Sequence, residues 1–144
     1  MSERNNQITG NIGLYYVCYL LSRHGWNAMP TSKNAEGIDL VVYKPGSNKY
    51  LGIQVKTLSK KSYSVPISRT FERAGGDAWV IVNLEKKADS NVEKAPQAYI
   101  MTSKEVDERI VTHPSGAKSV NPGDYTQPQF RDINKRLEEI LKKK

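Results

Sequence analysis

Three polar residues interrupt two otherwise apolar segments of this 144-residue chain. Asp39 lies within residues 38–43, and Gln54 and Lys56 lie within residues 50–57. Because side chains alternate between the two faces of a strand, each polar residue falls on the face opposite its aliphatic neighbours. We therefore expect a carboxylate, an amide and an ammonium group on one face of two strands.

The segment between these two strands is dense in turn-forming residues and predicts an antiparallel hairpin. A type II′ turn at Gly46-Ser47 would make paired residue numbers sum to 93, which places Asp39 opposite Gln54. A longer loop would shift this register. The opposite face of the hairpin would then carry six aliphatic residues: Ile38, Leu40, Val42, Leu51, Ile53 and Val55.

The polar trio suits the hydrolysis of a phosphodiester. Oxygen ligands hold Mg²⁺, which polarises the phosphate and lowers the pKa of bound water, while a lysine positions the water or stabilises developing charge. Gln54 offers a neutral carbonyl oxygen, which neutralises a cation less than a carboxylate does. The backbone carbonyl of Val55 is a further candidate ligand. The alternative is a structural ion pair between Asp39 and Lys56 at the sheet surface.

A long first helix is predicted ahead of the hairpin. Asn5 or Asn6 can cap its start, Gly25 predicts its end at about His24, and a strand is expected at residues 26–29. The helix carries so wide an apolar stripe that we expect burial on two sides. Packing roles are therefore expected for Tyr15, Tyr16 and Tyr19.

Three strands and then two helices are predicted after the hairpin. Strands are expected at residues 63–67, 78–84 and 97–101, and the apolar second of these is expected to be central. Thr102 and Glu105 have the spacing of a capping box, which predicts a helix to about Val111. Residues 113–124 read as a loop, and a last helix is predicted from about Pro128, with its apolar face at Phe130, Ile133, Leu137 and Ile140.

Length and composition favour a single domain over residues 1–144. They also favour a reducing compartment. Lys and Arg number 22 against 15 Asp and Glu, which gives a net charge of +7 and suggests a polyanionic partner. The single cysteine, Cys18, excludes an internal disulfide, and no apolar segment reaches the roughly 20 residues of a membrane span. We expect a cytoplasmic protein that does not engage a membrane.

Four short motifs resemble the PD-(D/E)xK, or restriction-endonuclease-like, nuclease superfamily. They are Gly10-Asn11-Ile12-Gly13, Gly25-Trp26, Glu36-Gly37-Ile38-Asp39-Leu40 and Ile53-Gln54-Val55-Lys56-Thr57. The resemblance covers roughly the first half of the chain well and the second half more loosely. It implies an α/β (α+β) fold with a mixed β-sheet flanked by helices in αβββαβ order. Asp39, Gln54 and Lys56 match the family's site positions.

The resemblance implies a Mg- or Mn-dependent DNA endonuclease, with Asp39, Gln54 and Val55 as metal ligands. Gln54 replaces the usual acid, as in the QxK branch that includes methylation-dependent restriction enzymes. Leu14 stands where many relatives carry a glutamate on the first helix, which removes one carboxylate. Glu36 could supply another if the loop at Gly37 turns it inward. Relatives often act as homodimers, because cutting two strands needs two sites.

Four cations follow the third strand and are candidates for contact with a phosphate backbone: Lys60, Lys61, Arg69 and Arg73. An exposed, solvated face is an equally good explanation of these charges. Tyr63, Phe71 and Trp79 are expected in the core more than as platforms for base stacking. Three functions remain open from the sequence: an endonuclease, an inactive relative that binds nucleic acid, and a structural or protein-binding module.

Overall fold

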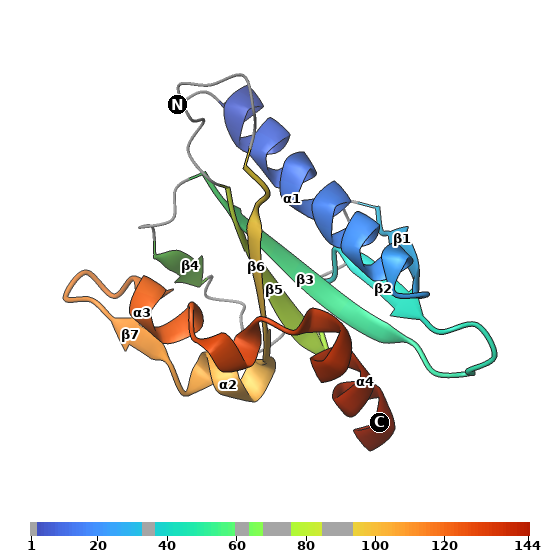
Figure 1. Ribbon diagram of the computed structural model, residues 1–144. Coiled ribbons are helices and arrows are strands. Elements are labelled where there is room, and N and C mark those ends of the chain that lie inside the picture. The colour runs from blue at the N-terminus through green and yellow to red at the C-terminus, as the bar shows by residue number, and fades with distance from the viewer. Residues whose placement is uncertain (1–2, 33–36, 60–63, 68–75, 85–93) are drawn as a thin grey trace.

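A five-stranded mixed sheet organises the computed structural model, which describes residues 3–32, 37–59, 64–67, 76–84 and 94–144 (Figure 1). The strand order is β1-β2-β3-β5-β6, with β3 and β5 parallel and the other neighbours antiparallel. This confirms the expected mixed sheet, in which β5 lies inside rather than at an edge. The strands are β1 (Asn27–Pro30), β2 (Leu40–Tyr43), β3 (Leu51–Leu58), β5 (Ala78–Asn83) and β6 (Gln97–Thr102).

Helix α1 (Glu3–Arg23) covers one face of this sheet. Val17 and Leu21 are fully buried there in a core shared with Leu40 and Ile53. Gly25 has a φ of 86°, the left-handed conformation that ends a helix, close to the predicted end. The expected burial of α1 on two sides is wrong, because Ile12, Tyr15 and Tyr19 on its outward side are exposed.

Helix α4 (Ile133–Lys143) packs on the same face of the sheet as α1. Its start was predicted at Pro128, but a short 3₁₀ helix, η2 (Pro128–Phe130), comes first. The side chain of Asp132 then accepts the Lys135 N–H at 3.0 Å and caps α4. Leu137 is fully buried, as its position on the predicted apolar face requires.

The other face of the sheet is covered by a smaller, three-stranded sheet in the order β4-β8-β7. Its strands are β4 (Val65–Ile67), β7 (Ile110–Thr112) and β8 (Lys118–Val120). A second core of buried residues lies between them and the main sheet, together with α3 (Pro122–Tyr125). It includes Val65, Trp79, Ile81, Tyr99, Met101, Val120, Tyr125 and Phe130.

Two sequence predictions in this region are wrong. Residues 113–124 are not a plain loop, because β8 and most of α3 lie within them. The helix after Thr102 has the predicted capping box, but α2 (Ser103–Asp107) ends early. The next residues, predicted as helix, instead pair with β8 as β7. Pairing with β8, which also pairs with the distant strand β4, here overrides a local helical pattern. No helix in the described ranges is long and apolar enough to cross a membrane.

Candidate active site

Asp39 lies where β2 and β3 separate. The two strands pair at Leu40–Ile53, Val41–Gly52 and Val42–Leu51, so paired numbers sum to 93, as predicted. The Asp39 N–H donates to the Ile53 carbonyl at 2.9 Å, and its carboxylate Oδ2 accepts the Val55 N–H at 2.8 Å. The Asp39 carboxylate thus accepts the Val55 N–H, which a backbone carbonyl of β2 would accept if the strand continued. Within the described residues β2 begins at Leu40, whereas β3 runs on to Leu58.

The turn that sets this register differs from the predicted one. The Ser47 N–H donates to the Lys44 carbonyl at 3.0 Å, and Gly46 has a φ of 89°. Pro45 and Gly46 are therefore the central residues, in the arrangement typical of a type II turn. The predicted type II′ turn at Gly46-Ser47 is wrong, but the longer connection preserves the sum of 93.

Asp39, Gln54 and Lys56 share the sheet face that is turned away from α1. Their aliphatic neighbours Leu40, Leu51 and Ile53 belong to the core beneath α1 and α4. Alternation then places the three polar residues on the opposite face. All three side chains are half-buried, so the site is open to solvent in part.

Ile38 departs from the predicted pattern. It was expected on the aliphatic face, yet a side chain on Gly52 would meet Ile38 at 2.9 Å, which places Ile38 against the polar face. Gly37 has a φ of 66° and the chain bends at Asp39. Strand alternation therefore does not extend back to residue 38.

The Val55 carbonyl points toward the side on which Asp39 lies. The Gly52 carbonyl accepts the Asp77 N–H, and the Gly52 N–H donates to the Asp77 carboxylate, just before β5. Both backbone groups of Gly52 therefore point toward β5. Val55, an odd number of residues away, turns both groups toward β2, as its bond to Asp39 confirms. The carboxylate of Asp39 and the Val55 carbonyl thus face the same gap.

Gln54 carries an unsatisfied polar atom. Its Oε1 is buried and makes no hydrogen bond with any part of the chain that the structure describes. A buried carbonyl oxygen without a donor costs about 1–3 kcal/mol. A cation beside Asp39 would satisfy this oxygen, so the donor set fits a hard divalent metal.

Lys56 is oriented by an aromatic ring. Its Nζ lies 5.9 Å from the ring centroid of Trp79, which is 1% exposed on the neighbouring strand. No ion pair joins Lys56 to Asp39, both of which are described. The alternative of a structural Asp39–Lys56 ion pair is therefore not what the structure contains. Trp79 is a core residue, as expected, but sequence did not reveal its place under Lys56.

Within the described residues, Asp39 provides the carboxylate of this site. No group of three or more His, Cys, Asp or Glu side chains that could hold a metal occurs in the described ranges. Leu14 packs against the core beneath α1. Glu36 lies outside the described residues, as do Tyr63, Phe71 and the four candidate cations: Lys60, Lys61, Arg69 and Arg73.

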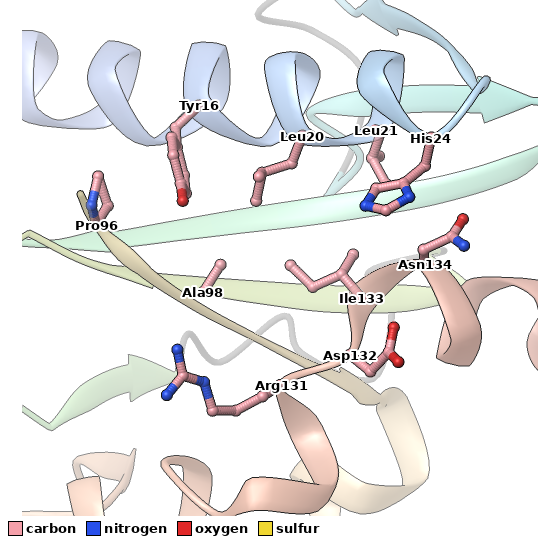
Figure 2. Close-up of a pocket in the computed structure, with 10 residues that line it drawn as sticks. All are labelled: Tyr16, Leu20, Leu21, His24, Pro96, Ala98, Arg131, Asp132, Ile133 and Asn134. Carbon is pink, nitrogen blue, oxygen red and sulfur yellow. The ribbon is translucent and has the colours of Figure 1, made fainter.

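A separate groove of about 320 Å³ lies on the other face of the sheet, between α1 and the start of α4 (Figure 2). Leu20, Ala98 and Ile133 give it an apolar floor, while Tyr16 and Arg131 lie at its rim. Burial raises the pKa of the Tyr16 hydroxyl, so this group stays neutral at ordinary pH. The groove does not contain the predicted site residues.

Comparison with solved structures shows the class of fold. The chain is similar to Hjc, a Holliday junction resolvase from the archaeal hyperthermophile Archaeoglobus fulgidus, with a TM-score of 0.56 and 15% identity over 90% of this chain and 95% of that chain. It is also similar to the bacterial homing endonuclease I-Ssp6803I, with a TM-score of 0.53 and 19% identity over 95% of this chain and 91% of that chain. The chain therefore has a nuclease-like fold. No protein-family model and no curated protein matches the sequence.

Proposed function

We propose that the chain is a Mg- or Mn-dependent DNA endonuclease of the PD-(D/E)xK type, in its QxK form. The observation that carries this proposal is the position of Asp39, Gln54 and Lys56 on one face of the sheet, where β2 and β3 separate, in a nuclease-like fold. Of these two structural neighbours, one is named a Holliday junction resolvase and the other a homing endonuclease, so we propose DNA as the substrate.

Each residue has a distinct part in this proposal. Asp39 and Gln54, with the Val55 carbonyl, would hold the metal ion, which when bound polarises the phosphate and acidifies a water molecule. The Val55 N–H fixes the orientation of the Asp39 carboxylate. Lys56, steadied by the Trp79 ring, places its ammonium group beside the phosphate, where it orients the attacking water or offsets developing negative charge.

Cleavage of supercoiled, linear, branched and single-stranded DNA with Mg²⁺ or Mn²⁺ tests the proposal. We expect metal-dependent cleavage of at least one form. Asp39→Asn should lower the rate at least about 100-fold, since even outer-shell changes at metal sites cost 10–100-fold. The amide oxygen can still accept the Val55 N–H, so the fold should survive. Lys56→Ala should also abolish cleavage, whereas Lys49→Ala, on the exposed hairpin loop, should not.

A second function is favoured by the shortage of carboxylates at the site. With Leu14 in the core and Gln54 neutral, the chain could bind nucleic acid without cleaving it. In that case, DNA binding would persist in Asp39→Asn, would weaken with salt, and no metal would produce cleavage. Failure to bind any DNA would favour the protein-binding module over both functions.

A further inference from the structure

The outward face of α1 is apolar although it is exposed to solvent. Ile8, Ile12, Tyr15 and Tyr19 are 48%, 44%, 61% and 55% exposed. Their spacings of four, three and four residues place them on one side of the helix. Val17, on the opposite side, is fully buried against the sheet. These four side chains, which we call the α1 outer stripe, therefore point away from the sheet.

This face also lacks charge. No charged residue occurs from Asn5 to Ser22, in a chain of which 26% of residues are charged. The solvated side of an amphipathic helix normally carries charged residues. The cores of protein interfaces, by contrast, are depleted in charge and enriched in tyrosine. Without Lys or Arg, the stripe cannot neutralise phosphates, so nucleic acid is a poor occupant.

We infer that the α1 outer stripe joins two copies of this chain in an antiparallel homodimer. Its four-three-four spacing reads the same in both directions, as a two-fold interface requires. Pairing two antiparallel α1 helices sets Ile8 against Tyr19 of the second copy, and Ile12 against Tyr15 of the second copy. Each contact then joins one aromatic ring with one smaller branched side chain.

Charge agrees with this occupant, and the stripe supplies part of the area that it needs. Arg23, whose guanidinium lies 5.7 Å from the Tyr19 ring centroid, is at one end of the stripe, so an antiparallel pair keeps the two arginines at opposite ends. Four half-exposed side chains of this size supply on the order of 400 Å², about half of the roughly 800 Å² that each partner buries in a standard interface. The interface would extend to exposed Asn11 and Ser22, and to Tyr16 at the rim of the groove in Figure 2.

The dimer would leave both candidate active sites open. α1 packs on one face of the sheet, whereas Asp39, Gln54 and Lys56 lie on the other. The inference does not depend on the proposed nuclease activity, and it can be tested without DNA.

Sedimentation equilibrium of the full chain over a concentration series tests the dimer. We expect the mass to rise from 16.2 kDa toward twice that value as concentration increases. The double variant Ile12→Glu, Tyr15→Glu should stay at 16.2 kDa with unchanged circular dichroism, because both side chains are exposed. Tyr50→Glu, at a tyrosine 50% exposed on the hairpin, is the matched control and should still dimerise. A monomer at every concentration, or a dimer in the double variant, would overturn the inference.

Disulfide cross-linking tests the antiparallel arrangement. In a Cys18→Ala background, Ile8→Cys protein and Tyr19→Cys protein are mixed and oxidised. We expect the mixed disulfide to dominate, because equivalent positions in the two copies would be offset by about 16 Å along the helix axis. Disulfides that form mainly within each single variant would contradict this arrangement. Binding of the stripe to a different protein, with this chain monomeric, would overturn the dimer.

Discussion

Asp39 combines a structural role with the proposed chemical one. Its carboxylate accepts the Val55 N–H, so the residue ends the pairing of β2 with β3 and stays fixed beside the gap that this ending creates. Removing the acceptor altogether, as in Asp39→Ala, would leave the Val55 N–H without its partner. Such a change would combine loss of fold with loss of function, which makes Asp39→Asn the cleaner probe.

Gln54→Glu is expected to lower the Mg²⁺ concentration needed for half-maximal cleavage. Gln54 Oε1 is buried and unsatisfied in the described part of the chain, and a carboxylate there would neutralise a divalent cation more fully than an amide. Titration of Mg²⁺ against the cleavage rate measures this effect. Gln127→Glu, in the connection between α3 and η2, is the control and should leave the titration unchanged. An increased or equal Mg²⁺ requirement in Gln54→Glu would argue against Gln54 as a ligand.

At the scale of elements, α1 approaches β3 through a glycine. A Cβ atom on Gly13 would lie 1.8 Å from Thr57 Oγ1, whereas a Cβ on Gly10 would meet nothing within 4 Å. The two glycines are one turn apart in the same helix. Alanine substitutions at the two positions therefore distinguish the effect of close packing from the general cost of glycine in a helix.

Gly13→Ala should lower the free energy of unfolding by about 1–3 kcal/mol, the usual cost of overpacking a filled core. Gly10→Ala should instead raise it by about 0.5–1 kcal/mol, through helix propensity alone. Urea denaturation of both variants provides the comparison. Equal effects of the two substitutions would show that α1 does not pack on Thr57 as described.

Tyr125 connects α3 to the main sheet and provides a test by pH. Its hydroxyl donates to Asn83 Oδ1 at 3.1 Å, and burial raises the pKa of this tyrosine above the usual value of about 10. Between the unfolded and folded pKa values, the unfolded chain loses a proton that the folded chain keeps. The contribution of Tyr125 to the free energy of unfolding should therefore be complete below pH 10 and fall as pH rises beyond it.

Tyr125→Phe should reduce this alkaline loss. At pH 7 it should also cost about 1–3 kcal/mol, because Asn83 Oδ1 would be buried without its donor. Denaturation of the wild type and the variant at several pH values checks both effects. A variant with the same pH dependence as the wild type would assign the alkaline loss to other groups.

The hairpin shows how much of the site could be predicted from sequence. Strand alternation and the turn-rich segment sufficed to predict the register that pairs Leu40 with Ile53, because register and face depend on local pattern. The turn type was wrong, since Pro45 and Gly46 suit a type II turn equally well. The place of Trp79 beside Gln54 depends on the parallel pairing of β3 with β5, across a segment of more than 20 residues. Local pattern carries no information about such a pairing.

The sequence pattern did not predict the strands that are stabilised by distant partners. β7 and β8 are three residues each, and Pro114 and Gly116 lie between them, so their pattern is that of a loop. They form because β8 pairs with both β4 and β7. In α1, by contrast, the helix itself was predicted, but the side that faces solvent was not. Periodicity identifies an apolar face and does not say what covers it.

At the scale of the whole molecule, the +7 charge predicts salt-dependent binding of DNA. If the four candidate cations neutralise four phosphates, affinity should fall roughly 100-fold between 50 and 200 mM salt. Fluorescence anisotropy with labelled DNA over a salt series gives the slope. Replacing Lys60, Lys61, Arg69 and Arg73 by alanine should make this slope shallower, by the equivalent of about four phosphate contacts. An unchanged slope would place the phosphate contacts elsewhere.

The central claim is that Asp39, Gln54 and the Val55 carbonyl form a divalent metal site where β2 and β3 separate. A crystal structure of the protein soaked with Mn²⁺, with anomalous diffraction recorded, tests it most directly. We predict an anomalous peak in contact with the Asp39 carboxylate and Gln54 Oε1, which disappears in Asp39→Asn. Mn²⁺ bound elsewhere, or absent at saturating concentration with Asp39 still bonded to Val55, would contradict the claim.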